Sequence, residues 1–258
     1  MNYWKEEGGI PYHGVVHLKE TVKQAKYFSV RNDGSHQRFL EQVGIDVPVV
    51  PDPGFHLELD RVDTAFSRPI EEPYVLIQLA NDKPLSRFGS QDQKDAFVHQ
   101  MRAVVKKIVC QFRVIFAPHV FDDISLSREI SSGIHGADIW DFGTYAFDNS
   151  KTALAYYKHA EFVIAMRGHG QIVPIAFGTP VIALENHPKH KGLMVNLGLE
   201  EYSLSVKEGE FSDSLESMIQ NIMINRRILV ERLKDISKSL DIETSNAILD
   251  LKKSIGKQ

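Results

Sequence analysis

Short apolar runs alternate with helical patterns along most of this 258-residue chain, and this alternation limits the possible folds more than any other feature. The runs are rich in Val, Ile and Phe, as strands buried in parallel sheets are. The pattern therefore predicts an α/β fold. The expected strands span 27–30, 47–50, 74–79, 113–117, 137–140, 162–166 and 181–184. The expected helices span 17–25, 35–43, 93–109, 124–130, 151–159, a short segment from His169, 211–225 and 226–253.

The alternation is interrupted by "PDPGFHLELDRVDTAFSRPIEEP", a segment with several prolines and no regular period. Pro and Gly interrupt helices and strands, so we place a boundary between two lobes near residues 54–72. Residues 1–66 are expected to form a small N-terminal lobe. Residues 67–258 are expected to form a larger, Rossmann-like lobe.

The composition excludes several classes of protein. A net charge of -4 argues against a general nucleic-acid binder, so any positive site is local. No stretch reaches the roughly 18 apolar residues that span a bilayer, and "MNYWKEEGG" lacks the apolar core of a signal peptide, so we expect a cytoplasmic protein. Cys110 is the single cysteine, and its neighbours in "KIVCQF" predict a small buried hydrophobe rather than a redox or metal site.

The stretch "EFVIAMRGHGQIVPIAFGTPVIALENHPKHKG" predicts an anion site. Its first apolar run is a strand that Arg167 ends, Gly168 permits a tight turn, and His169 begins a short helix. Ligands of open α/β sheets bind beyond the carboxyl ends of strands, where a helix N-terminus offers unpaired N–H groups. Arg167 can clamp a phosphate or carboxylate, His169 can donate a proton, and Gly170 lets a ligand approach the backbone. From spacing alone, a surface Arg paired with an acid and a His without a chemical role are equally open.

Two segments carry a set of motifs in a fixed order. They are "YFSVRNDGSHQRFLEQVGIDVPVVPDPGF" and "AEFVIAMRGHGQIVPIAFGTPVIAL", the second followed by "HPKHKGLMVNLGL". Together they resemble the polysaccharide pyruvyl transferase family. The Arg-x-His-Gly helix start, the Gly-Thr-Pro, and the later Lys and "LGL" are specific as a set. The resemblance covers most of residues 27–205. It implies two Rossmann-like lobes similar to two-lobed glycosyltransferases, a last helix that crosses back, and transfer of a pyruvyl group from phosphoenolpyruvate to a sugar of a cell-surface polysaccharide.

The resemblance also implies roles for individual residues. Arg167 and His169 would hold the donor anion, with His169 doing the acid/base work. Phosphoenolpyruvate carries a phosphate and a carboxylate, so further cations should converge on it. The candidates are Arg31, in "SVRNDGS", and Lys189 and Lys191, in "HPKHK". The two lysines lie in an expected loop, so solvated charges are the alternative reading.

Two more candidates follow expected strands. His119 in "FAPHVFDD" either faces the cleft or is a loop histidine, and Glu185 binds either an acceptor hydroxyl or Lys189. No metal is expected, because the chain lacks a DxD or His-rich spacing and only Asp122 and Asp123 hint at one. No cofactor is expected besides phosphoenolpyruvate as donor substrate.

The N-terminal lobe departs from the family pattern. "YFSVR" is reached at Tyr27 without the Gly-rich turn that normally opens this lobe, so the lobe is expected to be truncated. Strands without neighbours need cover, which predicts a homodimer through residues 1–66 and the C-terminal helix. Two other functions stay open, a glycosyltransferase that uses a nucleotide sugar and a non-catalytic anion- or saccharide-binding protein.

Overall fold

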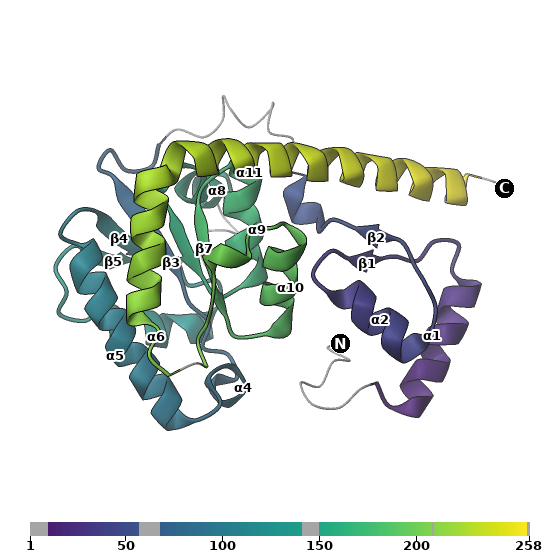
Figure 1. Ribbon diagram of the computed structural model, residues 1–258, viewed down its shortest axis with the longest axis horizontal. Coiled ribbons are helices and arrows are strands. Elements are labelled where there is room, and N and C mark those ends of the chain that lie inside the picture. The colour runs from purple at the N-terminus through teal and green to yellow at the C-terminus, as the bar shows by residue number, and fades with distance from the viewer. Residues whose placement is uncertain (1–9, 57–67, 141–149, 208, 257–258) are drawn as a thin grey trace.

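Two parallel β-sheets organise the chain, one in each of two lobes (Figure 1). The computed structural model describes residues 10–56, 68–140, 150–207 and 209–256. Residues 1–9 and 57–66 of the expected N-terminal lobe therefore lie outside the described residues, as does the expected boundary between residues 66 and 67. The expected α/β fold with two lobes and parallel sheets is confirmed.

The small lobe contains two helices and a two-stranded parallel sheet. Its elements are α1 (Tyr12–Gln24), β1 (Val30–Arg31), α2 (Ser35–Val43), β2 (Val49–Val50) and the 3-10 turn η1 (Pro53–Phe55). Val30 pairs with Val49, and α2 provides the crossover between the two strands. Gly34 and Gly44 flank α2 in the left-handed region, with φ values of 81° and 72°, which a glycine adopts without strain. Phe39 and Val43 of this helix are buried in a hydrophobic core that is separate from the core of the large lobe.

The large lobe is built on a six-stranded parallel sheet with the order β5-β4-β3-β6-β7-β8. Its strands are β3 (Tyr74–Gln78), β4 (Arg113–Phe116), β5 (Ala137–Ile139), β6 (Val163–Ala165), β7 (Val181–Glu185) and β8 (Ser203–Ser205). In chain order, the strands run outward from β3 on one side and from β6 on the other. This is the strand order of a Rossmann fold, and the reversal between β3 and β6 creates a crevice at their carboxyl ends.

Helices connect these strands and bury them, and every residue of β3 is buried. The helices are α4 (Pro84–Phe88), α5 (Gln91–Ile108), α6 (Phe121–Ser131), α8 (Ser150–His159), α9 (Gly168–Phe177), α10 (Pro188–Asn196) and α11 (Ser212–Ile255), with the 3-10 turn η2 (Glu200–Tyr202). Each expected strand overlaps an observed one. The short polar strand β8 was not predicted, because "SLS" carries too few apolar residues for a signal.

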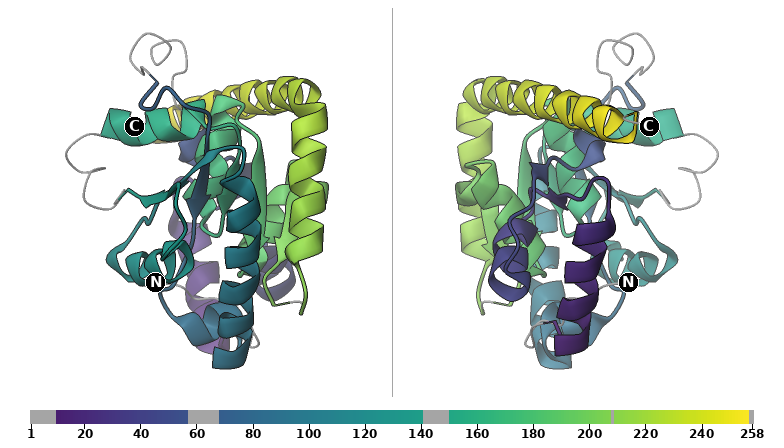
Figure 2. Two further views of the ribbon diagram at one scale, coloured as in Figure 1. Left: turned by 90° about the vertical axis from the view of Figure 1, so that its left-hand side faces the viewer. Right: turned by 90° about the vertical axis from the view of Figure 1, so that its right-hand side faces the viewer.

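The prediction of two C-terminal helices is wrong, because residues 212–255 form one helix, α11, of 44 residues. The sequence between its halves, "NIMINRRIL", holds no Gly or Pro that would end a helix. α11 packs on α5 and α9 of the large lobe, bends, and continues to the small lobe, where it contacts β2 and η1 (Figures 1 and 2). Asp241 of this second part lies 2.5 Å from His56 Nδ1, so α11 joins the two lobes.

Two smaller predictions are wrong. "HPKHK" is not a loop, because it forms the start of α10, with Pro188 in the first turn and His187 as the N-cap residue. Cys110 is exposed rather than buried, because it follows the end of α5 in the turn before β4 and does not reach the core.

Candidate active site

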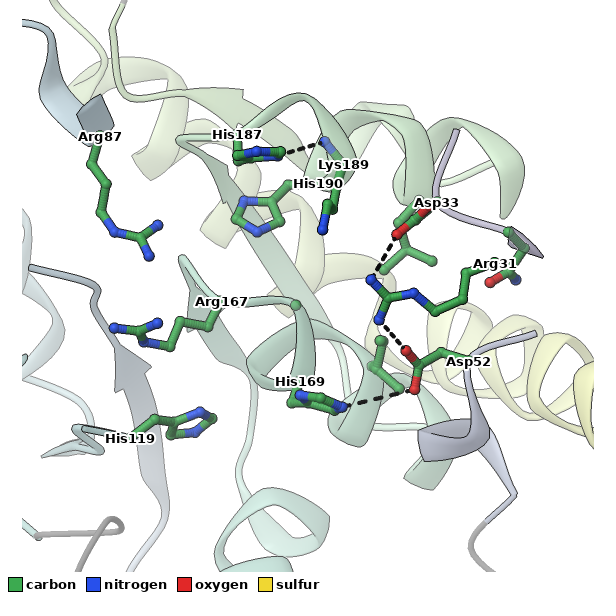
Figure 3. Close-up of a pocket in the computed structure, with 14 residues that line it drawn as sticks. Arg31, Asp33, Asp52, Arg87, His119, Arg167, His169, His187, Lys189 and His190 are labelled. Atoms are coloured by element: carbon green, nitrogen blue, oxygen red, sulfur yellow. Dashed lines mark hydrogen bonds and ion pairs between the residues drawn. The ribbon is translucent and has the colours of Figure 1, made fainter. Parts of the chain in front are cut away.

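A cavity of about 300 Å³ lies between the lobes, beyond the carboxyl ends of β3 and β6. This is the crevice that the strand order predicts for a ligand. Arg31, Asp33 and Asp52 line one side, and Arg87, Arg167 and His119 line the other (Figure 3). The remaining lining residues are Asn32, Gly168, His169, Ile172, His187, Lys189, His190 and Leu193.

The N-terminus of α9 opens into this cavity. Arg167 is its N-cap residue, with extended backbone, and no side chain caps the helix. The first N–H groups of α9, from Gly168 onward, are therefore available to an anion, and the helix dipole favours negative charge there. Nothing lies within 4 Å of where a Cβ of Gly168 would stand, so the cavity reaches this backbone.

The guanidinium of Arg167 is engaged by two carboxylates. Its Nε and Nη2 atoms donate to Asp123 at 2.8 and 2.7 Å, and Nη2 also donates to Asp82. Burial alone would lower the pKa of Arg167, but the bonds and charges of Asp123 and Asp82 outweigh burial and raise that pKa. The charge of Arg167 is thus compensated before any ligand binds, which is the structural alternative that its sequence position left open.

Asp123 links the three loops that follow β3, β4 and β6. Its fully buried carboxylate also accepts hydrogen bonds from the backbone N–H groups of Asn81 (3.0 Å), His119 (3.3 Å) and Val120 (3.3 Å). These donors follow β3 and β4, while Arg167 follows β6. Asp123 was noted in the sequence only as a weak metal signal, whereas here it fixes the carboxyl ends of three strands.

His119 lines the cavity but is held neutral. Its Nε2 lies 2.6 Å from the hydroxyl of Tyr157. Burial, and then the charge of Arg167, lower the pKa of His119 to about 4. At neutral pH this imidazole is therefore a neutral hydrogen-bonding group.

His169 is the more accessible histidine, with 66% of its side chain exposed, and its Nε2 lies 3.8 Å from Asp52 Oδ1. Asp52 also accepts bonds from Gly54 N–H at 2.9 Å and Arg31 Nη1 at 2.7 Å. Burial opposes the charge of Asp52, but these bonds hold the pKa of the carboxyl below its usual value. Asp52 was not among the residues predicted from the sequence, although an Asp before "PGF" is a signal for the capped turn η1 that positions it.

The start of α10 provides three further cavity residues. His187 Nδ1 accepts a bond from Lys189 N–H at 3.3 Å, and His190 is 8% exposed. Burial, followed by the charges of His187 and Arg87, lowers the pKa of His190 to about 3. Lys189 points into the cavity (Figure 3), and among the described residues it has no ion-pair partner. It is therefore an uncompensated positive charge in the cavity.

Three predicted site residues lie elsewhere. A Cβ on Gly170 would stand 3.0 Å from Gln78 Oε1 and 3.1 Å from Ala165 Cβ, so this glycine permits packing of α9 on the sheet rather than ligand approach. Glu185 accepts a bond from Ser203 Oγ rather than facing the cavity. Lys191 is exposed and does not line the cavity, since it lies on another side of α10.

No group of three His, Cys, Asp or Glu side chains within residues 10–56, 68–140, 150–207 and 209–256 is arranged to hold a metal ion. No helix in these ranges combines the length and the apolar character that crossing a bilayer requires.

The two sheets, the Rossmann strand order and the polar cavity between the lobes define a two-lobed α/β protein of the glycosyltransferase-like class. Residues 9–188 match the sequence model of polysaccharide pyruvyl transferases. The chain thus belongs to the polysaccharide pyruvyl transferase family, as its motifs predicted. No curated protein matches the sequence significantly.

Solved structures with similar folds agree with this class. MnaA of S. aureus, solved with UDP, is 12% identical, with a TM-score of 0.61 over 95% of this chain and 64% of that chain. A UDP-N-acetylglucosamine 2-epimerase assigned as putative in Listeria monocytogenes is 9% identical, with a TM-score of 0.50 over 100% of this chain and 83% of that chain. This chain thus spans less than two thirds of the length of MnaA. At such identities the likeness shows the fold alone.

Proposed function

We propose that this protein transfers a pyruvyl group from phosphoenolpyruvate to a sugar of a cell-surface polysaccharide, in the cavity between the lobes. The observation that carries the proposal is the uncompensated charge of Lys189 beside the uncapped N-terminus of α9, in a chain of this family. The donor has two anionic groups for these positive sites. Acid–base chemistry needs no further cofactor, and because phosphoenolpyruvate is a cytoplasmic metabolite, we assign the reaction to the cytoplasm.

The contacts suggest a division of roles. Lys189 and the first N–H groups of α9 bind the phosphate or the carboxylate of the donor, because neither has another partner among the described residues. Arg167 acts as a positioning residue, since Asp82 and Asp123 hold its guanidinium. Arg31 has a similar role, because it orients Asp52.

His169 carries the proton in this proposal. A proton is added to the methylene carbon of phosphoenolpyruvate, which becomes a methyl group and makes the neighbouring carbon electrophilic. A sugar hydroxyl oxygen bonds to that carbon, and a second hydroxyl of the same sugar displaces the phosphate. One hydroxyl proton passes through His169 and balances the proton on the methyl group, while the other leaves with inorganic phosphate. Asp52, at 3.8 Å, stabilises a positive charge on the His169 ring.

A comparison of two neighbouring lysines tests the binding site. Lys189→Ala should weaken phosphoenolpyruvate binding about tenfold or more in titration calorimetry, since a hydrogen bond to a charged group contributes about 1.5 to 3 kcal/mol. Lys191→Ala is the matched control, because Lys191 lies on the same helix outside the cavity, and it should bind as the wild type does. Unchanged affinity in Lys189→Ala contradicts the site.

Turnover tests the role of His169. His169→Asn should bind phosphoenolpyruvate but lose phosphate release with a panel of methyl hexosides and hexose 1-phosphates as acceptors. Equal loss of both would make His169 a binding residue only. Absence of release from the wild-type protein with every acceptor would favour the non-catalytic alternative.

A nucleotide-sugar donor is the second candidate function. The observation in its favour is the similarity of this fold to MnaA, which was solved with UDP. We rank it lower, because the match of residues 9–188 is to pyruvyl transferases.

A further inference from the structure

A second, smaller cavity of about 170 Å³ adjoins the donor cavity between the lobes. Asp33, Ser35 and Arg38 line it from the small lobe, and His187 and Lys189 line it from the large lobe. Asp33, His187 and Lys189 line both cavities, so the two are neighbours across these side chains. A ligand in the small cavity would thus lie beside the donor.

The charge in this second cavity is positive and not compensated. Arg38 and Lys189 each have no hydrogen-bond or ion-pair partner through their side chains in the described part of the chain. Asp33 does not balance both of them, because it is a single carboxylate and it is held by Ser35 and Arg31. Its Oδ1 accepts from the backbone N–H of Ser35 at 3.2 Å and from the Ser35 hydroxyl, and its Oδ2 pairs with Arg31 Nη2 at 3.2 Å.

We infer that Arg38 and Lys189 bind a phosphate group carried by the acceptor, so that the acceptor is a phosphorylated saccharide rather than a neutral one. The inference rests on the proposed function, since it assumes that the donor fills the larger cavity. The smaller cavity accommodates a phosphate, and cations from both lobes face it. Because Lys189 lines both cavities and also serves the donor, a neutral sugar would leave Arg38 without a partner beside it, whereas a phosphate pairs with Arg38 and shares Lys189 with the donor.

A substitution of Arg38 tests the small cavity alone, because Arg38 lines the small cavity and not the donor cavity. The probe is inorganic pyrophosphate, titrated by calorimetry into protein saturated with phosphoenolpyruvate. We expect the wild type to bind it and Arg38→Ala to bind it at least about tenfold more weakly, with phosphoenolpyruvate affinity unchanged. Arg227→Ala is the matched control, because Arg227 is an exposed arginine of α11 away from both cavities, and it should change neither affinity.

A competition experiment distinguishes a free phosphate ligand from a phosphorylated saccharide. Glucose 1-phosphate should displace pyrophosphate from the donor-saturated protein, and methyl glucoside should not. Displacement by inorganic phosphate alone, with none by glucose 1-phosphate, would overturn the assignment to an acceptor.

The two proposals fail in different ways. If phosphoenolpyruvate binds but pyrophosphate does not bind beside it, or binds Arg38→Ala as tightly as the wild type, the acceptor-phosphate site is wrong and the donor site stands. If phosphoenolpyruvate itself does not bind, the proposed function fails. Pyrophosphate binding to the unliganded protein, compared between wild type and Arg38→Ala, then still decides whether the small cavity binds phosphate.

Discussion

Arg167 depends for its role on residues that are distant in the sequence. Its position at the end of a strand and the start of a helix follows from the local pattern, and the structure agrees. Its partners Asp123 and Asp82 lie 44 and 85 positions away, so no local pattern could show that its charge is compensated. Asp52 was missed for the same reason, because it meets His169 only through the approach of the two lobes.

The ion pairs of Arg167 lead to a stability prediction. Arg167→Ala leaves the buried carboxylate of Asp123 without its main partner, which should lower the free energy of unfolding by about 3 to 5 kcal/mol. Urea denaturation followed by circular dichroism measures the change. The double variant Arg167→Ala, Asp123→Ala should recover part of the loss, and Arg128→Ala, at an exposed position of α6, should stay within about 0.5 kcal/mol of the wild type. Wild-type stability in Arg167→Ala would show that the pair is not structural.

The lowered pKa of His119 predicts that the stability of the protein depends on pH. The unfolded chain binds a proton on this side chain near pH 6.5, whereas the folded chain binds it only near the lowered pKa of about 4. The unfolded state thus holds more protons in this window, so the free energy of unfolding falls as the pH decreases, by at most about 1.4 kcal/mol per pH unit for one group. His119→Gln should flatten the slope between pH 6.5 and 4 in denaturation curves. His135→Gln, at an exposed position, should keep it, and an equal slope in both variants would contradict the account.

At the scale of elements, the apolar strands were predictable because burial in a parallel sheet is visible in each strand's own residues. α10 was not, because its first turn is charged and contains a proline, although Pro in the first turn is itself a helix-start signal. The continuity of α11 was also missed, since a long helix that serves two lobes has no single apolar face along its length. α9 and α10, which carry most of the candidate site, thus differ in how well their sequences reveal them.

Gly192 of α10 determines how closely the lobes approach. A Cβ at this position would lie 2.5 Å from Asp33 O and 3.1 Å from Gly34 Cα, so the backbone of the β1–α2 turn packs directly on the glycine. Asn196 Nδ2 of the same helix donates to Asn32 O at 2.9 Å. Gly192→Ala favours the helix by about 1 kcal/mol but should separate the lobes and weaken phosphoenolpyruvate binding several-fold in calorimetry.

The control for Gly192→Ala is Gly209→Ala, where a Cβ meets nothing within 4 Å. Gly209→Ala should bind the donor normally. Far-ultraviolet circular dichroism should show intact helices in both variants, so that weaker binding reports the lobe contact and not unfolding. Wild-type affinity in Gly192→Ala would mean that the contact does not shape the site.

At the scale of the molecule, the strand order predicts where a ligand binds, and the cavity lies there. Motifs that span both lobes also predicted the correct family. Arg31 was predicted, but Asp33 and Asp52 on the same small-lobe side of the cavity were not, because their position there depends on how α11 and α10 join the lobes. The candidate site thus exists only in the assembled pair of lobes, with Lys189 on one and Arg31 and Asp52 on the other.

Exposed apolar surface supports the proposal of a homodimer. α1 buries none of its residues, and Tyr12 is 85% exposed. The second part of α11 exposes Ile242, Leu249 and Ile255 by 52%, 51% and 55%. Light scattering at micromolar concentration should give twice the 29.2 kDa chain mass, and Leu249→Glu should shift the protein toward the monomer. A wild-type monomer would reject the dimer.

The identity of the donor is the most informative measurement for the proposed function. Thermal denaturation is measured with increasing phosphoenolpyruvate and, separately, with increasing UDP. We expect phosphoenolpyruvate to stabilise the wild-type protein by about 2.7 kcal/mol at 100 times its dissociation constant, Lys189→Ala to lose about half of this effect or more at the same concentration, and UDP to have little effect. Stabilisation by UDP with none by phosphoenolpyruvate would contradict the account and assign the cavity to a nucleotide-sugar donor.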